Sequence, residues 1–205
     1  MTTQDKETFS PAVRNRKRWT LVALMALFLS PVVAAWLWTP SSFRNRGELV
    51  EPPRPLPNLA MRSPAGDPVD LNSVLGRWTY VLLIEGPCLD LCRQVASNIE
   101  RARLSQGKNE KRIQLLMLSL TLQEMSALAA LSQEAPDIRA LGLEPQQQDT
   151  LLRVLGQSSE PADRGLQWIY LVDPLGNLMM RYPINSDAKD LRKDIGRLLR
   201  ASRIG

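Results

Sequence analysis

Histidine is absent from this 205-residue sequence, and only two cysteines occur in it. Without an imidazole the chain cannot form a Ser-His-Asp or Cys-His catalytic site. Its eleven glycines are scattered, so no glycine-rich phosphate loop is present. Three acidic residues could act as general acids or bases, namely Asp70, Glu85 and Asp173. Structural roles in turns and at helix ends explain their presence adequately. The two cysteines are therefore the main candidates for chemistry.

A basic surface of the kind that binds nucleic acid is also missing. The net charge is +5 and the pI is 9.6. The first 38 residues carry five basic and two acidic side chains, which leaves 21 basic against 19 acidic in the rest. A late group of basic residues alternates with Asp187, Asp190 and Asp194, which favours a solvated helix face. This group comprises Arg192, Lys193, Arg197, Arg200 and Arg203. We expect no nucleic-acid partner.

A long apolar run is present near the N-terminus. Twenty uncharged residues, Trp19 to Trp38, are enough for a helix to cross a bilayer, and tryptophans stand at both ends. The basic residues just before the run predict a cytoplasmic tail, residues 1–18. We therefore expect a single-pass protein of the inner (plasma) membrane, with its C-terminal domain on the periplasmic or intermembrane-space side. A signal peptide cleaved near Ala34 or Ala35 is the alternative, but the apolar run continues past that point.

The rest of the chain is predicted to form a spacer and one domain. Residues 39–57 are rich in proline and indicate an extended spacer, which leaves 58–205 for the domain. Buried strands are expected at Trp78–Ile84 and Ile113–Leu120, and a β-hairpin at Trp168–Val172 and Asn177–Tyr182. Helices are expected at Cys88–Leu104, from the capping box Thr121–Glu124 to Gln133, at Gln147–Leu155 and at Ala188–Ala201. This order predicts an α/β fold with parallel strands and a hairpin in one mixed sheet.

The two cysteines, Cys88 and Cys92, stand at the predicted start of the helix that follows the first buried strand. The helix N-terminus stabilises a thiolate, which makes Cys88 the better nucleophile. Residues four apart on a helix have Cα atoms about 6 Å apart, a spacing that a disulfide accepts. A reversible disulfide is therefore feasible. A purely structural disulfide is the alternative, although so short a loop gives little stabilisation.

Two segments, Leu75–Cys92 and Ile169–Gly176, resemble the Sco/SenC family of membrane-anchored proteins that assemble the copper centre of cytochrome c oxidase. Asp90 matches the family's aspartate inside the cysteine motif. The resemblance implies a three-layer, thioredoxin-like domain behind one transmembrane helix. Family members bind copper with both cysteines and a histidine, and the position of that histidine corresponds to about Gly165. Leu89 and Arg93 replace the prolines that follow the family's cysteines.

Three functions stay open. In the first, the protein is a thiol-disulfide oxidoreductase: Cys88 attacks a target and Cys92 resolves the mixed disulfide. By resemblance, the target is a cytochrome c oxidase subunit or one of its assembly factors. In the second, both thiolates hold Cu(I) as a copper chaperone, with a thioether from Met117, Met179 or Met180, although core packing explains these methionines more simply. The third is a non-catalytic assembly scaffold. Trp78 and Trp168 are expected in the core rather than at a site.

Overall fold

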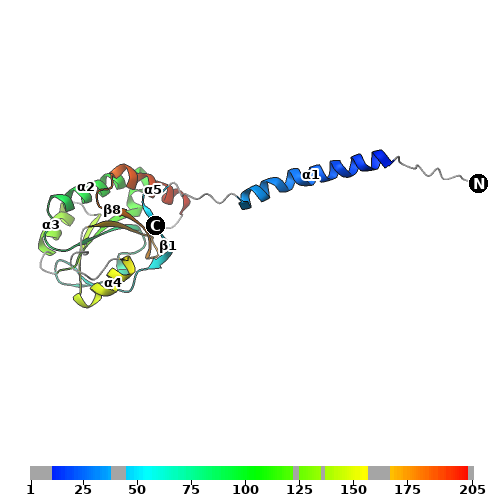
Figure 1. Ribbon diagram of the computed structural model, residues 1–205. Coiled ribbons are helices and arrows are strands. Elements are labelled where there is room, and N and C mark those ends of the chain that lie inside the picture. Colours follow the sequence, from blue (N-terminus) through cyan, green and yellow to red (C-terminus); the bar gives the residue numbers. More distant parts are fainter. Residues whose placement is uncertain (1–10, 38–44, 122–124, 135–136, 157–166, 203–205) are drawn as a thin grey trace, which may run out of the picture. The chain divides into compact units, whose positions relative to one another are not determined.

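The computed structural model describes residues 11–37, 45–121, 125–134, 137–156 and 167–202, which fall into two compact units. The first unit contains helix α1, Pro11–Leu37 (Figure 1). Its stretch Arg18–Leu37 is long and apolar enough to cross a membrane, and every side chain in that stretch is exposed. The length and apolar composition of this stretch agree with the predicted membrane span.

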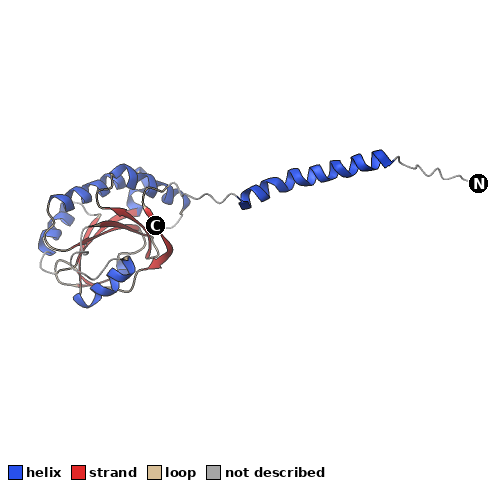
Figure 2. Cartoon of the chain, in the orientation of Figure 1, coloured by secondary structure: helices blue, strands red, loops and turns tan. Residues whose placement is uncertain are grey.

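The second unit is built on a mixed sheet of eight strands (Figure 2). The strand order is β1-β8-β7-β4-β5-β6-β2-β3. Strands β4, β5 and β6 run parallel, and the remaining pairs are antiparallel. The bounds are β1 Glu48–Pro55, β2 Ala60–Arg62, β3 Pro68–Asp70, β4 Trp78–Ile84, β5 Ile113–Ser119, β6 Ile138–Leu143, β7 Trp168–Val172 and β8 Asn177–Pro183.

Helices cover both faces of this sheet (Figure 1). Side chains of α2, α3 and α5 belong to one apolar cluster, and those of α4 belong to a second cluster on the opposite face. The result is the three-layer α/β arrangement predicted from the sequence. The α-helices are α2 Asp90–Leu104, α3 Met125–Glu134, α4 Gln148–Leu155 and α5 Ala188–Ala201, and the 3₁₀ turns are η1 Leu71–Ser73, η2 Gly107–Arg112 and η4 Pro145–Gln147.

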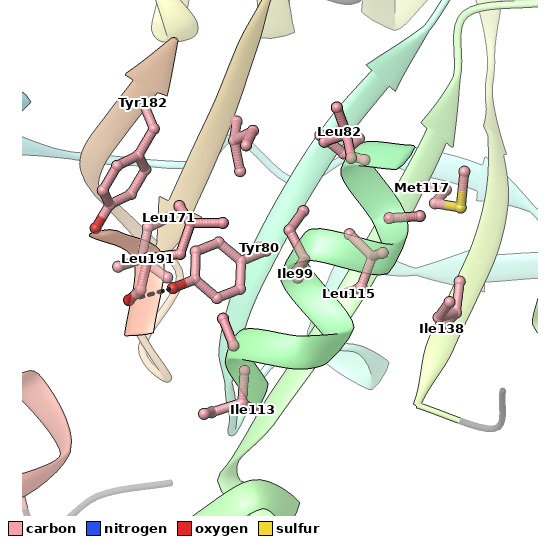
Figure 3. Packing of buried hydrophobic residues seen from close by; sticks show 14 of the residues in the cluster. Tyr80, Leu82, Ile99, Ile113, Leu115, Met117, Ile138, Leu171, Tyr182 and Leu191 are labelled. Carbon is pink, nitrogen blue, oxygen red and sulfur yellow. Dashed lines mark hydrogen bonds between the residues drawn. The ribbon is translucent and has the colours of Figure 1, made fainter. Parts of the chain in front are cut away.

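Strand β4 lies at the centre of the domain, and all seven of its side chains are buried. Tyr80 and Leu82 contribute to the cluster under α2 and α5, whereas Val81 and Leu83 contribute to the other cluster. Figure 3 shows the first cluster, in which the Tyr80 hydroxyl donates to the Leu191 carbonyl at 3.2 Å. An uninterrupted apolar run is what a strand buried on both faces requires, and it explains why the sequence identified β4 to the residue.

The predicted proline-rich spacer is wrong over Glu48–Pro55, because these residues form strand β1. This strand pairs antiparallel with β8, and its register shifts between Leu49 and Arg54, where two prolines interrupt the ladder. Proline cannot donate a ladder hydrogen bond, so it is tolerated on an edge strand such as β1. The compact unit accordingly begins at Asn45 rather than at residue 58.

Other boundaries differ less. Helix α2 begins at Asp90 and not at Cys88, and Leu89 is its N-cap. The β7–β8 hairpin and α5 are confirmed. Short strands β2, β3 and β6 have no distinctive periodicity, and the sequence analysis did not identify them. The capping box falls partly outside the described residues, because Glu124 belongs to the segment 122–124.

Candidate functional site

The cysteine pair lies at the carboxyl end of the central strand. Strand β4 ends at Ile84, Gly86 turns the chain with a positive φ of 89°, and Cys88 follows two residues before α2 begins. Cys92 lies in the first turn of α2. Because β7 runs antiparallel to β4, the start of β7 lies at the same end of the sheet. The pair follows the buried strand as predicted, but only Cys92 lies in the helix, because Cys88 precedes the first residue of α2.

The two sulfur atoms are joined in a disulfide, with the Cα atoms 5.2 Å apart. Cys88 is 7% exposed and Cys92 is 3% exposed, and both pack in the same apolar cluster as Met117. Disulfide exchange requires access to one of the two sulfur atoms, and Cys88 is the slightly more exposed residue.

The three residues between the cysteines form an exposed surface beside the buried disulfide. Leu89 is 66% exposed and Leu91 is 48% exposed, and Asp90 between them is also exposed. The spacing of Leu91 to Val95 and Ile99 predicts that Leu91 lies on the buried stripe of the helix, and its exposure shows that this prediction is wrong. The stripe instead runs through Cys92, Val95, Ala96, Ile99 and Ala102. If Cys92 is counted as an apolar core residue, the sequence predicts this buried stripe and leaves Leu91 outside it.

The loop before the helix has few restraints apart from the disulfide. In the part of the chain that the structure describes, residues 85–88 form no backbone hydrogen bond to another element. The neighbouring strand end is fixed, because the Leu120 amide donates to the Ile84 carbonyl at 2.8 Å. A segment with few hydrogen bonds opens at low free energy, so reduction of the disulfide would release this loop first.

The described residues offer two sulfur ligands for a metal and no complete ligand set. They contain no group of three or more histidine, cysteine, aspartate or glutamate side chains that could hold a metal ion. Met117 and Met180 are buried in the core, and the Met180 sulfur accepts from the Tyr182 hydroxyl at 3.5 Å. Met179 is partly buried against the same cluster. Gly165, which corresponds to the family's histidine, lies outside the described residues.

Among the remaining sequence candidates, Glu85 is exposed, and Asp70, Asp173 and the two tryptophans have structural roles. Asp70 caps η1 by accepting from the Asn72 amide at 2.8 Å, and Asp173 holds the β7–β8 turn by accepting from the Leu175 and Asn177 amides. Trp78 is buried in the core, and Trp168 packs under the Arg181 guanidinium, 4.4 Å from the ring centre.

Comparison with known proteins identifies the domain. Residues 78–202 match a family model described as "Transmembrane-like, thioredoxin-like, C-terminal domain". A search of the curated proteins found no match. Among solved structures, apo Sco1 from Thermus thermophilus matches with a TM-score of 0.61 and 17% identity, over 79% of this chain and 99% of that chain.

Two further structures have the same fold. Copper-bound ScoI from Arabidopsis thaliana matches with a TM-score of 0.56 and 17% identity, over 71% of this chain and 98% of that chain. A thiol:disulfide interchange protein from Bacteroides sp. matches with a TM-score of 0.53 and 15% identity, over 74% of this chain and 91% of that chain. The chain therefore belongs to the family of transmembrane-like, thioredoxin-like C-terminal domains, and its domain has the Sco-like fold that its cysteine motif predicted.

Proposed function

We propose that this protein is a membrane-anchored thiol-disulfide redox factor that acts through Cys88 and Cys92 in assembling the copper centre of a cytochrome c oxidase. One observation carries the proposal: a disulfide with a very short loop lies at the end of the central strand, beside an exposed pair of leucines. The apolar helix α1 and the basic residues before it support an anchor with the domain on the outer side of the inner membrane. Disulfides form and persist on that side.

The reaction begins with the reduced protein. The Cys88 thiolate attacks a disulfide of the target, a Cys88–target mixed disulfide forms, and one target sulfur leaves as a thiolate. The Cys92 thiolate then attacks Cys88, which releases the second target sulfur and forms the Cys88–Cys92 disulfide. Two electrons pass from this protein to the target, whose copper-binding cysteines become free thiols. A dithiol reductant of the same compartment returns the pair to its reduced form.

The exposed surface beside the disulfide supports contact with a protein target. Leu89 and Leu91 offer apolar area within three residues of Cys88, and an apolar contact there would bring a partner's backbone over the sulfur. Asp90 between them carries a negative charge that would disfavour an acidic partner segment.

Copper binding by the two thiolates is the second candidate, supported by the copper-bound Sco structure of the same fold. Cu(I) accepts soft ligands at low coordination number, so two thiolates suffice in principle. Among the described residues, no histidine, aspartate or glutamate side chain completes a three-ligand group with the pair. We therefore rank copper binding below disulfide exchange, and a scaffold that needs neither cysteine third.

Trapping of the mixed disulfide tests the reaction. Cys92→Ser removes the resolving thiol, so the full chain should accumulate a covalent adduct with its target that reductant removes on gels. Cys88→Ser is the matched control and should trap none, because the attacking thiol is gone. Because the chain has no other cysteine, any adduct in these variants reports one residue. Equal trapping by both variants, or by neither, would contradict the assigned roles.

Three more measurements separate the alternatives. A reduction potential far below about −300 mV would mark an inert structural bridge and reject the redox role. Competition of the reduced full chain against a Cu(I) chelator, repeated with Cys88→Ser/Cys92→Ser, tests the copper chaperone. Normal oxidase assembly in cells that carry the double serine variant would favour the scaffold.

A further inference from the structure

A basic groove lies between the end of helix α2 and helix α5, away from the cysteines in sequence and fold. Its volume is about 370 Å³. Four of its seven lining residues are basic and no acidic residue lines it: Ser105, Gln106, Arg192, Lys193, Gly196, Arg197 and Arg200. So many positive charges around one hollow favour an anionic ligand.

The basic and acidic residues of α5 alternate in sequence but separate in the fold. Arg192, Gly196 and Arg200 follow each other at intervals of four residues, so they lie on the same side of α5 and line the groove together. The acidic residues point to the other side. Asp194 is 1% exposed and accepts from the Arg46 and Gly47 amides at 2.7 and 3.0 Å, and Asp190 pairs with the Arg46 guanidinium. The helix face expected from the sequence is solvated at Arg192 and Arg200, which are exposed, but no acidic residue lines its groove side.

Most positive charges in the groove have no nearby carboxylate partner. Arg197 pairs with Asp194 at 3.2 Å. Arg192, Lys193 and Arg200 form no ion pair with any carboxylate in the described part of the chain. Like charges one helical turn apart repel each other, and a bound anion would remove that repulsion.

Gly196 keeps the floor of the groove open. A Cβ atom there would lie 3.1 Å from Gln106 Oε1 and 3.6 Å from Arg200 Nη1. Gln106 is held in place, because its amide nitrogen donates to the Arg192 carbonyl at 3.2 Å and thereby ties the end of α2 to α5. The hydrogen bond from Gln106 to Arg192 and the small residue Gly196 therefore determine the shape of the groove between α2 and α5.

Guanidinium groups match the oxygens of phosphate through paired hydrogen bonds, and lysine adds a point charge. From this chemistry we propose that the groove binds a phosphate group, supplied by the headgroup of an anionic phospholipid. The short segment between α1 and the domain favours a lipid headgroup as the source of the phosphate. About nine residues separate the end of α1 at Leu37 from Arg46, which restricts Arg46 to within about 30 Å of the helix end. Arg46 in turn is bound to α5 through Asp190 and Asp194. Anionic bilayers attract basic segments held close to them.

The test uses the full chain reconstituted in phosphatidylcholine vesicles with or without phosphatidylglycerol, at low salt. Hydrogen exchange of the α5 amides is measured in both. We expect exchange to slow severalfold when phosphatidylglycerol is present. Arg192→Gln/Arg200→Gln should abolish that slowing, and Lys193→Gln should reduce it. Arg101→Gln/Arg153→Gln removes the same charge from exposed sites outside the groove and should leave the slowing unchanged.

A second arm adds inorganic phosphate to phosphatidylcholine vesicles, with sodium chloride at equal ionic strength as its control. If inorganic phosphate slows hydrogen exchange of the α5 amides only when Arg192 and Arg200 are present, that result would support a phosphate site in the groove whose ligand is soluble and not a lipid. The proposal is overturned if neither additive slows exchange, if Arg192→Gln/Arg200→Gln retains the effect, or if the control pair loses it equally. None of these outcomes depends on the cysteines, so the groove and the redox role fail or stand separately.

Discussion

Gly47 lies against the ring of Tyr182 so closely that a Cβ atom on Gly47 would come within 2.4 Å of Tyr182 Cε1. The Gly47 amide donates to Asp194, and strand β1 begins at the next residue. Tyr182 is fully buried and cannot move aside. Glycine is therefore required at this position, because the space between Gly47 and the Tyr182 ring is too small for a methyl group.

Gly47→Ala should lower the free energy of unfolding by about 2 kcal/mol, because the added methyl group forces β1 away from Tyr182. Denaturant unfolding of the full chain in detergent measures this. Arg46→Ala is the matched control, since its ion pair with Asp190 is exposed and contributes little. Equal stability of Gly47→Ala and the natural chain would show that β1 does not pack as described.

Asp194→Asn should destabilise the attachment of β1. Almost fully buried, the carboxylate accepts from both backbone amides at Oδ2 and from Arg197 at Oδ1. An asparagine that keeps its oxygen on the amides turns its NH₂ group toward the Arg197 guanidinium, and its uncharged oxygen accepts more weakly. We expect a loss of about 2 kcal/mol and faster hydrogen exchange in β1 and β8. Asp190→Asn, on the exposed side of the same helix, should change neither quantity measurably.

The buried tyrosines predict weakening at alkaline pH. Burial raises the pKa of Tyr80, and burial together with the nearby Tyr80 and Asp194 raises the pKa of Tyr182. Both side chains stay neutral in the folded chain while the unfolded chain ionises above about pH 10. Stability should be complete below pH 10 and then fall by about 1.4 kcal/mol per pH unit for each tyrosine. In Tyr80→Phe the decline should be shallower, although the lost bond to Leu191 costs about 1 kcal/mol at pH 7. An unchanged slope would contradict the assignment.

Arg103 joins helix α2 to the start of β6. Its side chain is 8% exposed, binds Glu100 through two nitrogens at 2.7 and 2.9 Å, and reaches Asp137 at 2.9 Å. The hydrogen bond with Glu100 raises the pKa of Arg103 against the effect of burial, so the guanidinium stays charged. Arg103→Met should cost about 2 kcal/mol in thermal or denaturant unfolding. Arg101→Met, which is exposed on the same helix, should cost much less.

The disulfide should contribute modestly to stability. Cross-linking a loop of about five residues stabilises by about 2 kcal/mol at most in the chain-entropy model. Reductant should therefore lower the free energy of unfolding by no more than that amount, and Cys88→Ser/Cys92→Ser should not respond to reductant at all. A loss above 4 kcal/mol on reduction would mark the bond as a main structural support of the domain.

The sequence predicted the parts of the fold whose pattern is local. Strand β4 is one apolar run, and α5 places Leu191, Ile195 and Leu199 on one stripe, so both were bounded correctly. Strand β1 could not be predicted in the same way. Its prolines and exposed side chains have no strand periodicity, and only pairing with β8 makes it a strand.

The sequence predicted the cysteine pair and its position after a buried strand, but not the surface around it. Two cysteines four residues apart after a buried strand were enough to predict a disulfide. The exposure of Leu91 was missed because its spacing to Val95 fits the buried stripe equally well. The charge separation around α5 was also missed, because it depends on Asp194 binding Arg46 and Gly47, almost 150 residues earlier.

Strand β1 has a mechanical consequence. A force applied at the N-terminal end of β1 acts first on the hydrogen bonds of Arg46 and Gly47 to Asp194. It acts next on the hydrogen bonds between β1 and β8. Two strands, β8 and β7, stand between β1 and β4, and β4 is followed by the cysteine loop. A load that enters the domain at β1 would therefore have to cross these two strands before it changed the geometry around the sulfur atoms.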